Sequence, residues 1–101
     1  MTAHKAYNSP ATIVELTGAD QQITSSSAVL LGADVNDDAS GNVHLHIYHG
    51  TANTDPLILG MKPANGEHKM VWLGPNGIAC PNGIYVDVES GTPEGSIFIR
   101  T

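Results

Sequence analysis

The histidines near the middle of the chain are the first residues whose type and spacing could support chemistry. His44 and His46 lie two residues apart, so on a β-strand their imidazoles would point the same way and could share one metal ion. His49 falls on the opposite parity, and no carboxylate or cysteine follows at ligand spacing. Because the ligand set is incomplete, we expect no metal site and interpret these histidines as a solvated or partner-facing strand surface.

The acidic segment from Asp34 to Asn42 has oxygen-bearing side chains at every second residue, as calcium-binding loops do. Its sixth position is Ala39, where a calcium hand has Gly, and its twelfth is Leu45, where the hand has a bidentate Glu. A helix-flanked calcium hand is therefore excluded. We interpret the segment as a solvated hairpin loop.

Cys80 is the one cysteine, so it cannot form an intrachain disulfide. A thiol nucleophile needs a lowered pKa, and neither a helix N-terminus nor clustered cations are predicted beside Cys80. A small buried cysteine is the commoner case. The sequence also lacks a Gly-x-Ser-x-Gly elbow and a phosphate-binding glycine loop. We therefore expect no catalytic residue, no cofactor and no enzyme.

Trp72 is the one tryptophan, and it is either a core residue or an exposed stacking platform for a sugar or a partner. Its neighbours Met70, Val71 and Leu73 are apolar at both odd and even positions of the strand, so both faces are apolar. This is typical of a strand covered on both faces. We therefore expect Trp72 in the core. The Thr- and Asn-rich segment from Gly50 to Pro56 could hydrogen-bond a glycan, although such composition is ordinary for a loop.

The elements that position these residues are predicted to be short strands. The run from Val43 to Tyr48 alternates strictly, which places His44, His46 and Tyr48 on one face. The run from Tyr85 to Glu89 alternates in the same way. No segment has helical spacing over three turns, and Gly and Pro recur every few residues. The predicted strands are Thr12 to Thr17, Gln22 to Thr24, Ala28 to Val35, Val43 to Tyr48, Leu57 to Met61, His68 to Leu73, Tyr85 to Glu89 and Ser96 to Thr101.

Turns between the strands are marked by a Pro-Asn-Gly-Ile tetrad that begins at Pro75 and again at Pro81. Asn-Gly tolerates the positive φ angles of a tight turn, and Gly32 is a candidate β-bulge within its strand. About eight short antiparallel strands predict an all-β, two-sheet sandwich. We expect a jelly-roll-like topology, with an immunoglobulin-like one as the alternative.

The chain of 101 residues is predicted to be one domain over residues 11–101, preceded by an extended arm over residues 1–10. Charged residues make up only 14%, which suggests a surface in contact with other protein. Ten acidic residues outnumber four basic ones, so no basic stripe is available for nucleic acid. The sequence has no signal-peptide h-region and no membrane-length apolar run, so we expect synthesis in a cytoplasm without export and no membrane contact.

The order of strand and turn motifs resembles the small all-β structural proteins of tailed bacteriophages. Those chains commonly run from an x-Gly-x-Val-x-Leu-x strand to a Gly-Ile-x-x-x-x-Gly-Leu-Tyr-Val pair and finish on a short strand. The corresponding segments here are Ile23 to Val35, Ala39 to Gly50, Asp55 to Leu59, Leu73 to Ile78, Asn82 to Val88 and Gly95 to Arg100. The central-strand histidines depart from the family, which tends to have small polar residues or Asp there.

The resemblance implies a virion component, most simply a decoration or cementing protein on the capsid surface that bridges capsomers. It implies the major capsid protein or other virion proteins as partners and a homo-oligomer, with a trimer favoured. The arm would serve as a clasp on an adjacent subunit. The alternative is a tail, neck or fibre module, which could recognise a host-surface glycan. The predicted contact residues are Thr2, His4 and Tyr7 in the arm, and His44, His46, Tyr48 and Tyr85 on the wet sheet face.

Overall fold

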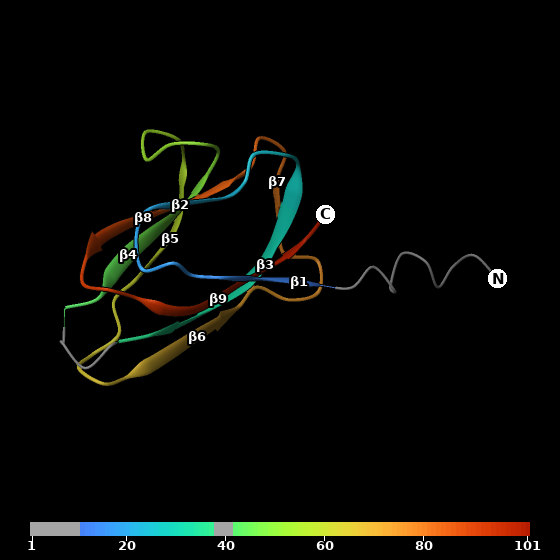
Figure 1. Cartoon of the computed structure of the whole chain (residues 1–101). Helices are drawn as coiled ribbons and strands as arrows, with labels where there is room; N and C mark the ends of the chain where they lie inside the picture. Colours follow the sequence, from blue (N-terminus) through green and yellow to red (C-terminus); the bar gives the residue numbers. More distant parts are fainter. Residues whose placement is uncertain (1–10, 38–41) are drawn as a thin grey trace.

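The computed structural model describes residues 11–37 and 42–101, which form nine β-strands (Figure 1). The strands are β1 (Thr12–Glu15), β2 (Gln21–Thr24), β3 (Ala28–Asn36), β4 (His44–His49), β5 (Leu57–Met61), β6 (His68–Trp72), β7 (Ile78–Cys80), β8 (Ile84–Ser90) and β9 (Glu94–Arg100). The predicted arm and residues 38–41 of the predicted hairpin loop lie outside the described residues. No helix among the described residues has the length and apolar character needed to span a membrane.

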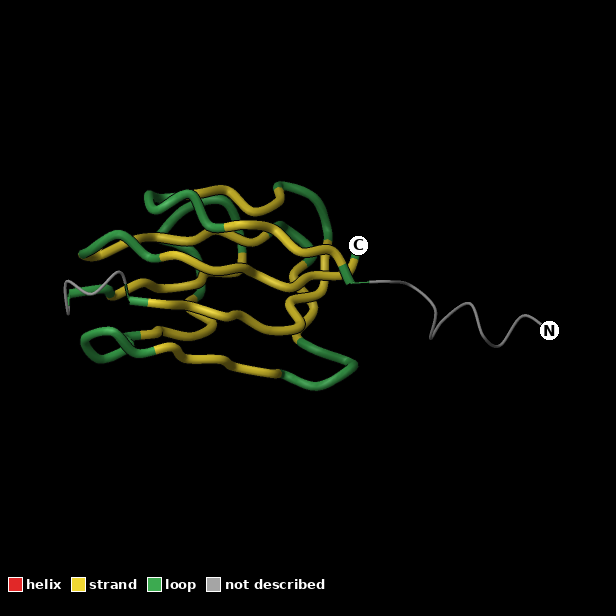
Figure 2. Tube along the Cα trace, turned by 60° about the horizontal axis from the view of Figure 1, so that its bottom comes forward, coloured by secondary structure: helices red, strands yellow, loops and turns green. Residues whose placement is uncertain are grey.

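The strands form two antiparallel sheets packed as a sandwich. Sheet A has the order β1-β9-β3-β6, with β7 also paired to β3, and sheet B has the order β2-β8-β4-β5. Figure 1 shows β2, β4, β5 and β8 gathered above β1, β9 and β6, and Figure 2 shows the strands side by side with loops at their ends. The predicted all-β sandwich is confirmed.

The pairing pattern is that of a jelly roll. The first strand pairs with the last, β2 with β8, β3 with β6 and β7, and β4 with β5 at the tip. The chain is thus one long hairpin whose successive strand pairs alternate between the two sheets. Nine strands rather than about eight are present, because Ile78–Cys80 between the two Pro-Asn-Gly turns pairs with β3 as β7.

The core lies between the inward faces of the two sheets. Leu45 and Ile47 of β4, Val86 of β8, Val35 of β3 and Ile97 of β9 are all fully buried. They alternate with outward-facing residues because side chains on a strand point to opposite faces in turn. A fully buried aliphatic side chain contributes about 1.5–3 kcal/mol relative to its exposed state. The same alternation that fills the core therefore fixes which residues face outward.

Glycines allow the chain to make its turns and its bulge. Gly77 and Gly83 in the twin Pro-Asn-Gly turns have φ angles of 57° and 108°, in the region that favours glycine, as the sequence predicts. The register of β3 against β9 shifts between Leu30 and Gly32, so the predicted bulge is also confirmed.

Candidate functional site

An apolar row crosses the outer face of sheet A. Ile13 of β1 lies opposite Phe98 of β9, Phe98 lies opposite Gly32 of β3, and Gly32 lies opposite Trp72 of β6. Met70 projects from the next outward position of β6. We refer to Ile13, Phe98, Trp72 and Met70 together as the apolar strip. Strand register therefore brings side chains from three strands, β1, β9 and β6, into one row, with Gly32 of β3 between Phe98 and Trp72.

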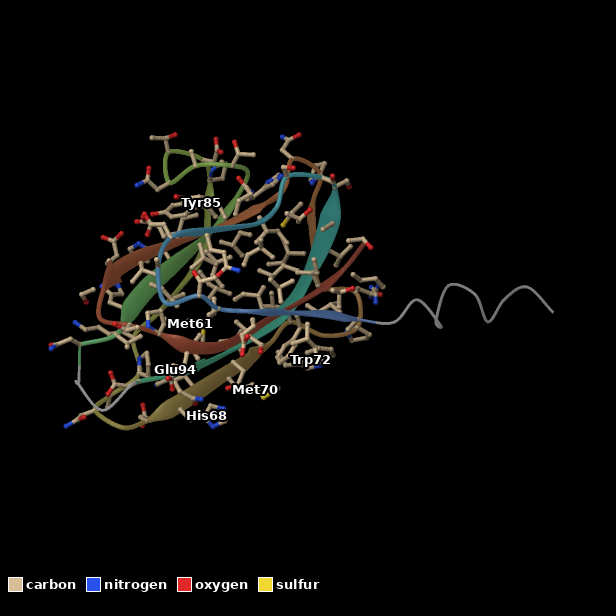
Figure 3. The ribbon with its side chains drawn as sticks, in the orientation of Figure 1. Met61, His68, Met70, Trp72, Tyr85 and Glu94 are labelled. Atoms are coloured by element: carbon tan, nitrogen blue, oxygen red, sulfur yellow. The ribbon has the colours of Figure 1, made fainter. Side chains whose placement is uncertain are left out.

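Three residues of the apolar strip are open to solvent, and Phe98 between them is half-buried. Ile13 is 66% exposed, Met70 60% and Trp72 59%. Figure 3 shows Met70 and Trp72 in succession along β6, on the same side as His68. The Trp72 ring lies over Gly32, since a Cβ added to that glycine would be 3.4 Å from Cε3 of the ring. A side chain on Gly32 would therefore meet the indole.

The prediction that Trp72 lies in the core is wrong. Strand β6 is at the edge of sheet A, and only Val71 and Leu73 pack partly against the core. Trp72 lies between Val71 and Leu73 in sequence, so its side chain is on the opposite face of the strand and points away from sheet B. Apolar neighbours on both sides of Trp72 predict a strand covered on both faces, whereas in the structure Trp72 and Met70 are exposed.

Acidic residues border the apolar strip on one side. The row beside Ile13, Phe98 and Trp72 contains Glu15 of β1 and Asp34 of β3, and it ends at Met70 of the strip. Glu94 lies one row further along. His68 Nε2 contacts the Asp34 carboxylate. At the other end of the face, the Arg100 guanidinium donates a hydrogen bond to the Pro75 carbonyl oxygen at 2.6 Å. The strip therefore has an acidic margin on one side, and Arg100 lies at its far end.

The outer face of sheet B is polar, as predicted. Tyr48 lies opposite Tyr85, and His46 lies opposite Asp87, across the pairing of β4 with β8. His44 shares this face, and its ring contacts that of His46 edge-on with centroids 4.7 Å apart. The structure thus brings the four predicted contact residues of the wet face together. That they contact a partner stays a prediction, and Thr2, His4 and Tyr7 lie outside the described residues.

Three ionisable side chains on sheet B converge in a cluster of His46, Asp87 and Glu89, whose ligand atoms all lie within 4.8 Å of one another. His46 Nδ1 is 3.8 Å from a Glu89 carboxylate oxygen and 3.3 Å from the Tyr48 hydroxyl oxygen. The register of β4 against β8 shifts at this point, which leaves Glu89 as an extra residue. A bulge of this kind re-aims a side chain.

The carboxylates of this cluster cannot be found from spacing along the chain, because they meet His46 only across paired strands. Asp87 is far from His46 in the sequence and directly opposite it in the sheet. A usable signal was present. Both runs alternate, and both place ionisable residues on their wet faces, so pairing them would have put a carboxylate beside an imidazole.

Burial and like charge shape the electrostatics of the cluster. Asp87 is only 7% exposed. Its pKa is raised above the ordinary value, first by a hydrogen bond with Glu89, then by burial and by the charge of Glu89. Hydrogen bonds with Asn53 and Asp20 act in the opposite direction. The pKa of the Tyr48 hydroxyl is raised by burial and then by the charges of Asp87 and Glu89.

The remaining sequence candidates have structural roles. Cys80 is fully buried, and burial raises the pKa of its thiol, which disfavours a thiolate nucleophile. In the acidic segment, the Asp37 carboxylate accepts hydrogen bonds from the backbone N–H of Gly66 at 2.8 Å and of Val43 at 3.4 Å. Asp37 thereby joins this loop to the turn before β6.

Cavities lie beside loops of the sandwich. One of about 390 Å³ lies between residues 15–18 and 92–95, and one of about 270 Å³ lies beside His49, Asp55 and Asn82. The Asp55 carboxylate accepts hydrogen bonds from the backbone N–H of Thr51 and Ala52, at 2.9 and 3.1 Å. Some of the hydrogen-bonding groups of the loop that could contact a glycan are thus already paired with one another.

Comparisons with known proteins identify no relative. No family model matches the chain, and neither the curated proteins nor the solved structures contain a match. The chain is a small all-β protein with two antiparallel sheets.

Proposed function

We propose that this protein is a structural component of a virion, and specifically a decoration or cementing protein that docks on the outer capsid shell through the apolar strip of sheet A. The exposed strip is the observation that carries the proposal. Four of the five large apolar residues that the described part of the chain exposes lie on sheet A: Ile13, Met70, Trp72 and Ile78. A protein that works by being bound needs such a surface more than it needs a catalytic site.

The physical argument rests on the cost of leaving these side chains in water. A side chain the size of Ile or Met contributes about 1.5–3 kcal/mol when it moves from water into an apolar contact. Contiguous apolar surface of this kind marks interaction sites, and Trp and Met are enriched in interfaces. The resemblance of the strand and turn motifs to phage structural proteins supplies the class of partner.

In this proposal, the strip seats on the shell and residues 1–10 reach an adjacent subunit as a clasp. Many copies, assembled as trimers, bridge neighbouring capsomers and add interface area against internal pressure. The acidic margin at Glu15, Asp34 and Glu94 favours a shell surface with basic residues around an apolar patch. Added salt should therefore lower the association rate with the shell more than it lowers the affinity of the final complex. The role is binding and not catalysis, and its place is the capsid surface.

Cosedimentation with empty heads of the parent virus tests the proposal. The variant Met70→Thr/Trp72→Ser removes two exposed apolar side chains from sheet A, and Leu57→Ser is its matched control, because Leu57 is 55% exposed on sheet B. We expect the double variant to lose affinity at least about tenfold and the control to bind like the wild type. Deletion of residues 1–10 tests the clasp, and light scattering gives the mass of the assembly.

Other outcomes would redirect the proposal. Wild-type protein that ignores heads and copurifies with tails would replace the capsid role with the alternative tail, neck or fibre role. If Leu57→Ser or His44→Asn abolished binding to heads while the double variant did not, the docking face would be sheet B and the strip would have no part in it.

A further inference from the structure

We infer that His46, Asp87 and Glu89 form a binding site for one divalent cation of the Zn²⁺ class on the outer face of sheet B. This site lies on the sheet opposite the apolar strip and does not depend on the proposed function. The juxtaposition of one imidazole and two carboxylates from two paired strands is the observation from which it starts.

The spacing of the donor atoms suits a small cation. Zn²⁺ binds His nitrogen and carboxylate oxygen at about 2.0–2.2 Å, so neighbouring ligand atoms in a tetrahedron lie about 3.3 Å apart. His46 Nδ1 and the Glu89 oxygen are now 3.8 Å apart, and no ligand atom of the three residues is more than 4.8 Å from another. The donor atoms would have to approach one another by at most about 1.5 Å to reach this spacing.

The burial of Asp87 is the second, independent observation. Its side chain is more than nine-tenths buried, and within residues 11–37 and 42–101 no Lys or Arg forms an ion pair with it. Besides the His46 imidazole opposite it, the groups that hydrogen-bond its carboxyl group are the acidic Glu89 and Asp20 and the neutral Asn53. A buried carboxylate is stable when it is paired or coordinates a metal, and two carboxyl groups in contact need a shared cation or proton. Two carboxyl groups here face one imidazole, so a bound cation would supply positive charge to the cluster.

A glycine lies against one edge of the His46 ring. Gly60 of β5 lies opposite His46, and a Cβ there would be 2.9 Å from Cδ2 and 3.4 Å from Nε2 of the ring. That edge of the imidazole therefore rests on the Gly60 backbone, and Nδ1 faces Glu89 and Tyr48. Nδ1 is then the ligand atom, and the Tyr48 hydroxyl would leave it when the ion binds.

The donor set also indicates the class of metal. One nitrogen and two oxygens suit a borderline cation such as Zn²⁺, whereas Ca²⁺ and Mg²⁺ prefer oxygen ligands alone. Three protein ligands leave a fourth position open for water or for a group of a partner. The site would join β4 to β8 where the register shifts, and so stabilise sheet B locally.

Isothermal titration of the tag-free, metal-stripped protein with ZnCl₂ and with CaCl₂ tests the inference. We expect one Zn²⁺ per chain and no Ca²⁺ binding at the same concentrations. Glu89→Gln should lower Zn²⁺ affinity at least about tenfold, because losing even an outer-shell partner of a ligand costs 10–100-fold. The matched control is His44→Asn, which removes the neighbouring imidazole and leaves the three ligands in place. Far-UV circular dichroism verifies that each variant is folded.

Backbone NMR provides a measurement that does not depend on any variant. Adding Zn²⁺ should shift the amide signals of residues 44–48 and 85–89 and leave those of β1 and β6 unchanged. The inference is overturned if the wild type fails to bind Zn²⁺ saturably, or if Glu89→Gln binds as tightly as the wild type. It is also overturned if His44→Asn is impaired as much as Glu89→Gln.

Discussion

The outer faces of the two sheets are built by the same alternation, yet one exposes a tryptophan and aliphatic side chains and the other exposes imidazoles and carboxylates. Sheet A presents Ile13, Met70 and Trp72 to water, and sheet B presents His46 and Glu89. Apolar surface gains most from contact with a large protein partner, whereas convergent ionisable groups suit a small ligand. The contrast teaches that the two faces of one small sandwich can be specialised separately, because the core between them isolates each from the other.

The largest expected effect concerns what the two sheets share, which is the core. Ile97→Ala in sheet A and Ile47→Ala in sheet B each remove a fully buried side chain and leave a cavity. We expect each to lower the free energy of unfolding by about 2–5 kcal/mol. Urea unfolding measures this. If one of the two variants lost less than about 1 kcal/mol of unfolding free energy, the inner face of its sheet would be packed more loosely than that of the other sheet.

The second prediction contrasts the two glycines on which outer-face rings rest. A Cβ on Gly32 would collide with the Val71 carbonyl oxygen of the backbone, whereas a Cβ on Gly60 would collide with the His46 ring and lie at ordinary contact distance from the Leu45 carbonyl oxygen. Gly32→Ala should therefore cost about 1–3 kcal/mol of stability, and Gly60→Ala less than about 1 kcal/mol, because a side chain can move and a paired strand cannot. Thermal unfolding of the two variants compares them, and equal losses would contradict this account.

The third prediction is a pH dependence confined to sheet B. The pKa of Asp87 is raised in the folded protein from its ordinary value of 3.8, so the folded state holds a proton that the unfolded chain releases. The stability contribution is therefore fully present below that value and is lost as pH rises through the raised pKa. Metal-free wild-type protein should lose stability relative to Asp87→Asn over this interval. Urea unfolding at pH 4 and at pH 6 measures this. If the urea midpoint changed by the same amount in the wild type and in Asp87→Asn, the prediction would be refuted.

The smallest expected effect on stability is at the apolar strip. Trp72→Ala should change the free energy of unfolding by no more than about 0.5 kcal/mol, because the ring is largely exposed, whereas a core tryptophan would cost about 3–5 kcal/mol. Iodide should quench Trp72 fluorescence in the folded protein. A large loss of stability, or a shielded indole, would show that sheet A is covered in solution.

Alternation along single strands could be predicted well from the sequence, because it depends on local chemistry. It placed His44, His46 and Tyr48 on one face, and the Asn-Gly pairs placed the turns at Gly77 and Gly83. The jelly-roll topology also follows the prediction made from strand number and turn spacing.

What could not be predicted depends on register and on position within a sheet. Asp87 meets His46 only because β8 lies beside β4 in one particular alignment. Trp72 is exposed because β6 is an edge strand, which its own composition does not reveal. Gly32 supports the indole from a strand far away in the sequence. These facts are relations between strands, so a reading of each strand by itself misses them.

The place of β9 between β1 and β3 has a consequence for how the protein is made. On the ribosome, β3 emerges long before β9, yet β9 is its neighbour along almost its whole length. Until Glu94–Arg100 has been synthesised, one edge of β3 has no partner strand, and β1 has no strand to pair with at all. Such distant pairings are slow to form and leave strand edges open meanwhile. Sheet A therefore closes only after translation has passed its final strand, and the nascent chain must be kept from pairing with its neighbours until then.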